Sequence, residues 1–233
     1  MADGEGKGAL IVGAGSGLSA SLARQMAAKG YRVGLAAREV EKLQPLADEI
    51  GAVSFACDAS DPGSVEAMFV AADAALGDID AVFFNASARA RGPFVDLDPA
   101  EVKRAIEITA FGGFLVAQAA VRRMLPRGHG AILFTGASAS VKGYPRSAPF
   151  AMGKFALRGL AQSLARELAP ENIHVAHFVI DGGIRAEARP EPTDNPDSML
   201  DPEAIAHTYL HVLEQDRSAW TWEVELRPWV ERF

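Results

Sequence analysis

The sequence predicts a single-domain α/β fold in which helices cover both faces of a parallel sheet. Six short apolar runs alternate with about 15 to 30 residues of mostly helical pattern. Strands and helices that alternate in this way form doubly wound parallel sheets. The 233 residues, 49% of them hydrophobic, can bury one substantial core, and no linker or internal repeat divides them. We therefore expect one domain over residues 1–233.

The predicted strands are short and rich in aliphatic and aromatic residues. Six of them cover residues 9–12, 32–36, 52–56, 81–84, 131–135 and 175–180. Near the end of the chain, Trp220, Trp222, Val224 and Leu226 alternate with other residues, which is the period of a half-buried strand. This segment brings the expected number of strands to about seven.

The helix boundaries between these strands carry clear signals. Asp61, Asp98 and Asp201 each precede a proline, which combines an N-cap acceptor with a residue whose missing N–H is harmless at the first helical position. Glycines that follow periodic segments mark three helix ends: Gly30, Gly51 and Gly77. These signals define three strand–helix–strand crossover units.

Composition and charge exclude several function classes. Asp and Glu outnumber Lys and Arg by 30 to 23, so the net charge is −7 and nucleic acid is not an expected partner. No apolar run reaches eighteen residues and the first eight residues do not form a leader, so we expect a cytoplasmic protein without a membrane segment.

Cys57 is expected to be a buried small hydrophobe. His207 and His211 share a helical face without a carboxylate or cysteine partner, so no metal site is expected.

A glycine-rich turn follows the first strand and opens a helix. It contains Gly13, Gly15, Ser16, Gly17 and Leu18, and it also satisfies the G-x-G-x-x-[GA] spacing. Glycines let a diphosphate approach the backbone, and the helix N-terminus offers unpaired N–H groups and partial positive charge. The turn thus predicts a Rossmann-type dinucleotide-binding domain.

The end of the second strand indicates which dinucleotide is bound. An acidic residue there would accept hydrogen bonds from a ribose 2′-OH, whereas an arginine pairs with a 2′-phosphate. The stretch from Leu35 ends in Arg38 and contains no acid. Arg38 therefore favours NADP (NADPH) over NAD, although a solvated charge at a helix start is the alternative interpretation.

Several segments together resemble the short-chain dehydrogenase/reductase family over about residues 7–226. The turn resembles TGxxxGxG, the Asn85 segment resembles NNAG, and Phe150 to Lys154 resembles YxxxK with phenylalanine in place of tyrosine. The resemblance implies a nicotinamide cofactor, small-molecule substrates and a homodimer or homotetramer. The cofactor-binding residues it implies, with Arg38 added, are Gly13, Gly15, Ser16, Gly17, Leu18, Asp58, Ala59, Asn85, Ala86, Lys154 and Ile184.

The family's proton-transfer residues are poorly matched in this chain. In the family, tyrosine exchanges the substrate proton, lysine lowers its pKa, and serine and asparagine assist. Here Lys154 is retained, Phe150 stands for the tyrosine and Thr109 for the asparagine. Thirteen residues before Phe150 lies Ala137, so Ser138 is the nearest candidate serine and Ser140 a weaker one. Phe150 is either a core aromatic or a wall of the site, and Tyr144 is an alternative phenol.

These observations support two functional hypotheses. The first is an NADP(H)-dependent oxidoreductase that acts on a small carbonyl, alcohol or conjugated substrate, with an atypical proton donor such as Tyr144, water or the substrate itself. The second is a cofactor-binding sensor or assembly protein with impaired catalysis.

Residues 187–198, rich in proline and acid, form either a mobile substrate loop or a plain surface loop. Arg89 and Arg91 either meet an anionic substrate or are solvated charges.

Overall fold

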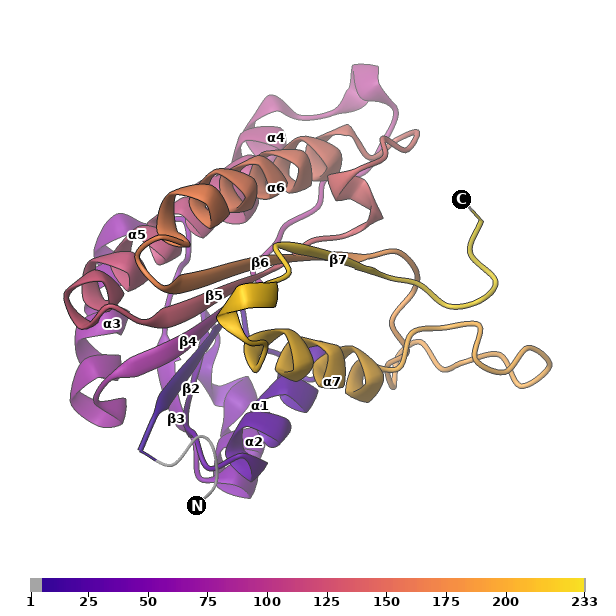
Figure 1. Ribbon diagram of the computed structural model, residues 1–233. Helices are drawn as coiled ribbons and strands as arrows, with labels where there is room; N and C mark the ends of the chain where they lie inside the picture. Colours follow the sequence, from indigo (N-terminus) through magenta and orange to yellow (C-terminus); the bar gives the residue numbers. More distant parts are fainter. Residues whose placement is uncertain (1–5, 233) are drawn as a thin grey trace.

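A parallel sheet of seven strands forms the centre of the computed structural model, which describes residues 6–232 (Figure 1). The strand order is β3-β2-β1-β4-β5-β6-β7, and every neighbouring pair is parallel. The strands are β1 (Gly8–Val12), β2 (Arg32–Ala37), β3 (Val53–Ala56), β4 (Ile79–Phe84), β5 (Gly130–Thr135), β6 (Ile173–Ile180) and β7 (Glu223–Leu226). The predicted Rossmann-type doubly wound sheet is therefore confirmed.

Helices lie on both faces of the sheet (Figure 1). One face carries α1 (Leu18–Ala28), α2 (Gln44–Ile50) and α7 (Pro202–Leu213). The other carries α3 (Pro62–Leu76), α4 (Pro99–Ile106), α5 (Gly112–Met124) and α6 (Ala148–Leu168). A π-helical turn, Glu107–Phe111, joins α4 to α5. Single 3-10 turns occupy Val40–Leu43, Phe94–Asp96, Leu125–Arg127, Ser138–Ser140 and Arg217–Ala219.

The predicted helix caps are confirmed. The side chains of Asp61, Asp98 and Asp201 accept hydrogen bonds from the backbone N–H groups of Ser64, Ala100 and Glu203 respectively. The three glycines predicted to end helices all have positive φ, namely Gly30 at 88°, Gly51 at 67° and Gly77 at 66°. Local chemistry thus determines where these helices begin and end.

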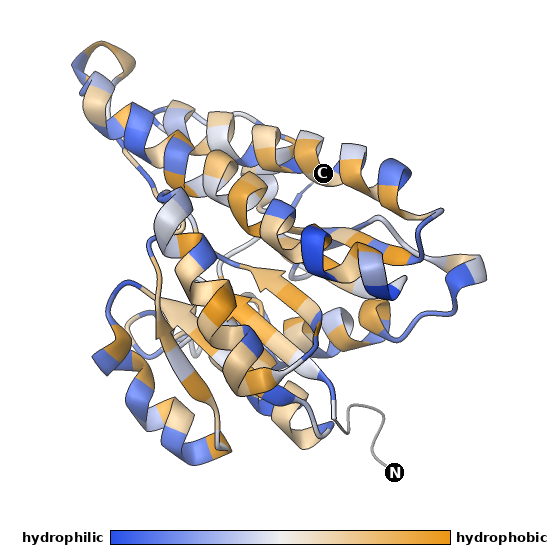
Figure 2. Ribbon diagram, turned by 90° about the vertical axis from the view of Figure 1, so that its left-hand side faces the viewer, coloured by the Kyte–Doolittle hydropathy of each residue, from blue (hydrophilic) through white to orange (hydrophobic). Residues whose placement is uncertain are grey.

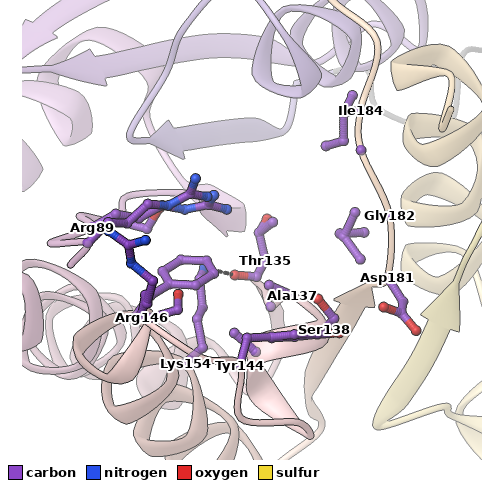
Figure 3. A pocket seen from close by; sticks show the side chains of 18 of the residues that line it. Arg89, Thr135, Ala137, Ser138, Tyr144, Arg146, Lys154, Asp181, Gly182 and Ile184 are labelled. Carbon is purple, nitrogen blue, oxygen red and sulfur yellow. Dashed lines mark hydrogen bonds between the residues drawn. The ribbon is translucent and has the colours of Figure 1, made fainter. Parts of the chain in front are cut away.

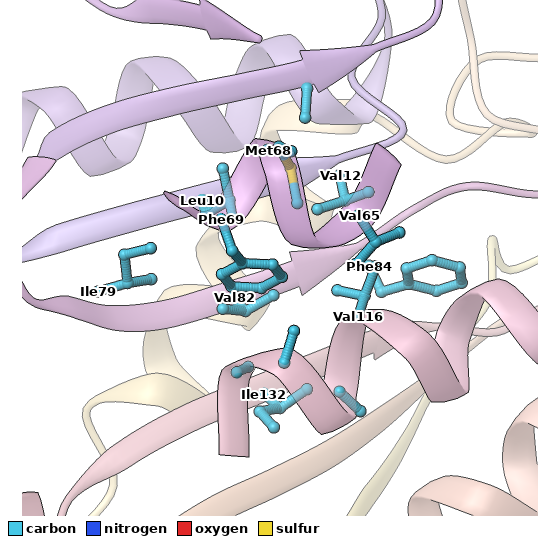
Figure 4. Packing of buried hydrophobic residues seen from close by; sticks show 14 of the residues in the cluster. Leu10, Val12, Val65, Met68, Phe69, Ile79, Val82, Phe84, Val116 and Ile132 are labelled. Carbon is cyan, nitrogen blue, oxygen red and sulfur yellow. The ribbon is translucent and has the colours of Figure 1, made fainter. Parts of the chain in front are cut away.

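Each face of the sheet buries its own apolar layer. Strand residues that point to one side pack against α3, α5 and α6, as Figure 4 shows for Leu10, Val82, Phe84 and Ile132. Residues that point to the other side pack against α1 and α7. Figure 2 shows the result as apolar strands covered by helices of mixed polarity. Burial on both faces explains why the strand sequences read as nearly continuous apolar runs.

The segment Pro99–Arg127 is long and apolar enough to cross a membrane by length and composition, but half of its most apolar stretch is buried inside the molecule. It comprises α4, the π turn, α5 and the following 3-10 turn. Val116, Ala117 and Ala120 of this segment belong to the core beneath the sheet. The segment therefore has the character of a core helix, a type that passes the same length and composition test.

The strand order places a binding crevice at the carboxyl edge of the sheet. β1 lies between β2 and β4, so the chain leaves the sheet in opposite directions after β1 and β4. Ligands of open α/β sheets bind at such a reversal point, outside the carboxyl ends of the strands. The loops after β1, β2, β3, β4, β5 and β6 all meet at this edge.

Candidate active site

Two adjoining cavities lie along the carboxyl edge of the sheet. The smaller, of about 440 Å³, lies over the turn after β1 and the ends of β2 and β3. The larger, of about 840 Å³, lies over the ends of β4, β5 and β6. Asn85 and Ser87 line both cavities. The two spaces therefore form one continuous crevice, of a size suited to a nucleotide and a small second molecule.

The glycines of the turn after β1 have two distinct roles. Gly13 has φ +82°, and a Cβ atom there would overlap the backbone of Ala86, so this glycine is required for packing. A Cβ atom at Gly15 or Gly17 would meet nothing within 4 Å. These two glycines therefore present bare backbone to open space, as close approach of a diphosphate requires.

The helix that follows the turn is open at its N-terminus. No side chain caps α1 at Gly17, and its first turn contains no acidic residue. Ser16 is exposed and lines the smaller cavity, whereas Leu18 turns its side chain into the core and offers only its backbone. The N-terminus of α1 thus provides a favourable electrostatic environment for an anionic group, and the turn fits a dinucleotide.

The outer end of the smaller cavity is basic. Arg38 and Lys42 both line it, as does Glu39, whose carboxylate pairs with Lys42 at 2.5 Å. Lys42 is thus a second cation near Arg38, one that the sequence reasoning did not single out. Nearby, Asp58 accepts hydrogen bonds at one carboxylate oxygen from the N–H and hydroxyl of Ser60, at 3.0 and 2.6 Å, and these lower its pKa. Ala59 and Ala86 complete the lining.

A polar network under the crevice connects the two cavities. Asn85 donates to the hydroxyl of Ser19 at 2.8 Å and accepts a hydrogen bond from Thr135, whose hydroxyl lies 2.7 Å from that of Tyr209. Ser19 in turn donates to the carbonyl of Gly13 at 3.3 Å. The network fixes the Asn85 side chain between the glycine turn and the end of β5. Satisfied buried networks of this kind rigidify a site.

Lys154 is held at the floor of the larger cavity. It is 3% exposed, and its Nζ donates to the carbonyl of Thr135 at 2.6 Å, the dashed line in Figure 3. Burial and, to a smaller extent, the charge of Arg89 lower the pKa of Lys154 to about 7. An amine with a pKa near neutrality can both hold a ligand hydroxyl and exchange a proton.

Phe150 is both a core aromatic and a wall of the cavity. It is 6% exposed and packs with Ala137 and Ala139, yet it lines the larger cavity. The guanidinium of Arg89 lies over its ring at 4.0 Å from the centroid, and the Lys154 ammonium lies at 5.9 Å. The phenyl ring thus occupies the space between two cations, an arrangement that its quadrupole favours.

The two candidate serines have different environments. Ser138 lines the larger cavity together with Ala137. Ser140 is fully buried, accepts a hydrogen bond from Ala137 N at 3.1 Å and lies 3.3 Å from His177 Nε2. His177 Nδ1 lies 3.0 Å from Glu223, and burial lowers the pKa of His177 to about 4. Ser140 and His177 are closed to solvent and stabilise the loop after β5, whereas Ser138 lines the cavity and can contact a ligand.

The remaining candidate residues differ in how far they are exposed to the crevice. Tyr144, 44% exposed, and Ile184 line the larger cavity from opposite loops (Figure 3). Thr109 is buried in the π turn and accepts a hydrogen bond from Ala88 N at 3.2 Å. Cys57 is buried, and burial raises its pKa to about 11. Among residues 6–232, no group of three or more His, Cys, Asp or Glu could hold a metal ion.

Comparison with known proteins agrees with this geometry. The family model for short chain dehydrogenases matches residues 7–195. The chain belongs to the short-chain dehydrogenase family of oxidoreductases. Short chain aldehyde dehydrogenase 1 of Euphorbia lathyris is 34% identical over 182 residues, which cover 73% of this chain and 62% of that protein. D-threitol dehydrogenase of Mycolicibacterium smegmatis is 31% identical over 73% of this chain and 68% of its own length.

Solved structures of family members share the whole fold. A short-chain dehydrogenase from Rhodopseudomonas palustris is 36% identical, with a TM-score of 0.83 over 97% of this chain and 100% of that one. A metagenomic short-chain oxidoreductase in complex with NADP is 28% identical, with a TM-score of 0.85 over 97% of this chain and 98% of that one. The resemblance stated from the sequence motifs is thus confirmed at the level of the family.

Several residues of the crevice were not found by sequence reasoning. Thr135 contacts Asn85 and is in turn contacted by Tyr209, a buried residue 74 positions from Thr135 in the chain. Arg146 and Arg189 line the larger cavity from loops whose course no local pattern predicts. Among these residues, only Thr135 carries a sequence signal, because it ends a predicted strand at the edge of the sheet where ligands bind.

Proposed function

We propose that this chain is an NADP(H)-dependent oxidoreductase that acts on a small carbonyl, alcohol or conjugated substrate, with a proton donor other than a tyrosine at position 150. The observation that carries the proposal is the continuous crevice from the open glycine turn to Lys154. A nicotinamide cofactor bound along it would supply or accept the hydride. Gly15, Gly17 and the N-terminus of α1 would hold the diphosphate.

The preference for NADP rests on charge at the outer end of the smaller cavity. Arg38 and Lys42 would pair with a 2′-phosphate, whereas the neighbouring acid Glu39 is engaged by Lys42. The NADP complex of the metagenomic relative is consistent with this assignment. Asp58 keeps one carboxylate oxygen free of the Ser60 contacts and would accept from the adenine amine.

Lys154 is the best-supported proton-exchanging group. It lines the cavity, and its pKa of about 7 lies near the operating pH of most enzymes. Ser138, in the loop after β5, would orient the substrate oxygen. Tyr144 and water remain the alternative donors, since Tyr144 also lines the cavity. Phe150 would exclude water from the reacting atoms, because its ring fills the space next to Lys154.

The proposal is tested by following the nicotinamide absorbance of NADPH with a panel of aldehydes, ketones and enones. We expect turnover with at least one class and a pH profile with an apparent pKa near 7. Lys154→Arg keeps a cation but should lose this inflection. Tight NADPH binding without turnover on any substrate would instead favour a cofactor-binding sensor or assembly protein.

We also propose that the protein assembles as a cytoplasmic homodimer or homotetramer through α5 and α6. Four large apolar side chains on this side are 41–51% exposed, and they are Phe111, Phe114, Met152 and Phe155. Phe111 and Phe114 stack with centroids 6.0 Å apart. Exposed aromatic and methionine side chains are typical of interface centres. Light scattering should give a mass at least twice 24.7 kDa, and Phe114→Glu should reduce it.

A further inference from the structure

Basic side chains gather around the larger cavity of an otherwise acidic protein. Five basic residues line it, and these are Arg89, Arg91, Arg146, Lys154 and Arg189. The carboxylates in its lining are Asp181 and Glu231. The whole chain carries a net charge of −7. A cavity whose charge opposes that of the molecule concentrates anions at its mouth.

Three of these arginines are not paired with an acidic side chain of residues 6–232. In the part of the chain that the structure describes, no carboxylate forms an ion pair with Arg89, Arg91 or Arg146. By contrast, Arg189 donates to the carbonyl of Ile184 at 3.0 and 2.6 Å. Of the two carboxylates, Asp181 is held by Lys142 at 2.8 Å. The three guanidinium groups therefore keep their full donor capacity for a ligand.

This crowding has an electrostatic cost that a ligand would relieve. Burial, followed by the charges of Arg91 and Arg189, lowers the pKa of Arg89. Like charges this close destabilise the folded protein in the absence of a counterion. An anion bound among them would raise the pKa of Arg89 and offset the repulsion.

The loops that carry the three arginines are joined to each other. Arg146 has φ +60°, in the left-handed region that non-glycine residues rarely adopt. Its carbonyl accepts a hydrogen bond from Gly92 N at 3.2 Å, which links the loop after β5 to the loop after β4. Figure 3 shows the outcome, with Arg89 and Arg146 on the same side of the cavity and Gly182 and Ile184 on the opposite side. Such strained positions cluster at ligand sites.

The arginines adjoin the residues that we assign to the chemistry. Arg89 and Lys154 both contact the Phe150 ring, with distances of 4.0 and 5.9 Å to its centroid. A ligand anion on Arg89 would therefore hold its neighbouring atoms next to Lys154. A small molecule with an anionic group at one end and a carbonyl group at the other would fit this arrangement.

We propose that the substrate is an anionic carbonyl compound, or the corresponding alcohol, whose carboxylate or phosphate is bound by Arg89, Arg91 and Arg146. This inference rests on the proposed oxidoreductase function and adds the chemical class of the substrate. A planar guanidinium matches both anions through paired N–H donors. The three arginines select the substrate, and Lys154 faces its carbonyl.

The test compares anions with neutral analogues of nearly the same shape. 4-Oxopentanoate is titrated against its methyl ester, and dihydroxyacetone phosphate against dihydroxyacetone, by calorimetry in a buffer without phosphate or carboxylate. Each titration is run with and without saturating NADPH. We expect at least one anion to bind about 10-fold or more tightly than its neutral analogue, because hydrogen bonds to charged groups are strong. The two pairs show whether carboxylate or phosphate is preferred.

Variants identify the residues responsible. Arg89→Gln and Arg91→Gln should each weaken anion binding about 10-fold while leaving the weak binding of the neutral analogue unchanged. Arg89→Lys should retain part of the affinity. Arg166→Gln is the matched control, because this arginine lies on α6 and donates to Gln162 O at 3.0 Å in its own helix. It should bind anions like the unchanged protein.

The outcomes separate this inference from the proposed function. Absence of NADPH binding would contradict the proposed oxidoreductase function. The anion titrations that are run without NADPH would still decide whether the arginines bind an anionic substrate. Equal affinity for anions and neutral analogues, or equal losses in Arg89→Gln and Arg166→Gln, would overturn it. If Arg89→Gln does not fold, exposed Arg91 provides the same comparison.

Discussion

The crevice has two ends, which we call the nucleotide end (the smaller cavity, over the turn after β1) and the carbonyl end (the larger cavity, around Lys154). They are built in different ways. The diphosphate cradle of the nucleotide end consists of backbone, two open glycines and a helix N-terminus, all close together in the chain. The carbonyl end consists of side chains from the loops after β4, β5 and β6 and from α6. A backbone cradle can serve any dinucleotide, whereas side chains on loops can change without disturbing the sheet. The difference teaches that family membership defines the first end, and that the reaction has to be argued from the second.

Replacing Lys154 should cause the largest functional loss and test the carbonyl end directly. In Lys154→Met the amine that we propose as the proton-exchanging group is removed, so we expect kcat to fall about 100-fold or more, the usual range for a lost acid–base group. Steady-state rates with the best substrate of the panel measure this. A loss below tenfold would show that another group carries the proton, with Tyr144→Phe as the parallel measurement.

The same variant should change the pH dependence of stability. The folded pKa of Lys154 is lowered from 10.5 to about 7, so the unfolded chain binds the extra proton between these values. The free energy of unfolding of the unchanged protein should therefore rise as pH increases from 7 toward 10.5, and Lys154→Met should lack this contribution. Urea titrations at pH 7 and pH 9 measure this change. If the amine were solvated, the free energy of unfolding would change by the same amount between the two pH values in both proteins.

A pair of glycine substitutions should separate packing from binding at the nucleotide end. Gly13→Ala adds a Cβ atom at φ +82° against the backbone of Ala86, so we expect a loss of about 2 to 4 kcal/mol in the free energy of unfolding. Gly15→Ala has open space and should keep the stability within about 0.5 kcal/mol while weakening NADPH binding. Urea unfolding and cofactor titration measure both. Equal effects of the two variants would contradict the division of roles.

Arg38→Ala should affect the two cofactors unequally. Loss of a charge-assisted contact to the 2′-phosphate should weaken NADPH binding about 10- to 100-fold and leave NADH binding nearly unchanged. Lys42→Met, in which the second cation is removed, should have a smaller effect in the same direction. Fluorescence titrations of both nucleotides give the comparison. Parallel losses for NADPH and NADH would remove the phosphate assignment.

Phe150→Tyr is expected to have the smallest effect. If Lys154 already exchanges the proton, an added phenol should raise the rate of carbonyl reduction by about tenfold or less. The Arg89 guanidinium lies over the ring, and its positive charge would favour the ionised form of the new phenol. Turnover of the same substrate panel tests this. A gain above 100-fold would assign the missing acid to position 150 and exclude Lys154 as the donor.

The fold and the nucleotide end could be predicted from the sequence because their signals are local. Strand runs, Asp–Pro caps such as Asp61, and the glycine turn each depend on a few neighbouring residues. The alternating tryptophan segment was predicted too long, since β7 starts at Glu223 and Trp220 instead stacks on His174 at 4.5 Å. Tertiary packing therefore decided the start of the edge strand.

The carbonyl end could be predicted only in part. Arg89 and Arg91 could be suspected from their place after a strand, but Arg146 joins them through a left-handed backbone turn that no pattern signals. The choice between Ser138 and Ser140 needed the buried partner His177, 37 positions from Ser140. Contacts of this range depend on loop conformation, which the sequence does not encode locally.

The central claim is that the crevice binds NADP(H) over the glycine turn. Thermal unfolding with increasing NADPH and NADH tests it most directly, because a ligand that binds the folded state stabilises it by RT ln(1 + [L]/Kd). We expect a melting temperature that rises with NADPH concentration, a smaller rise with NADH, and a smaller rise with NADPH in Gly15→Ala. An unchanged melting temperature at millimolar NADPH would contradict this claim.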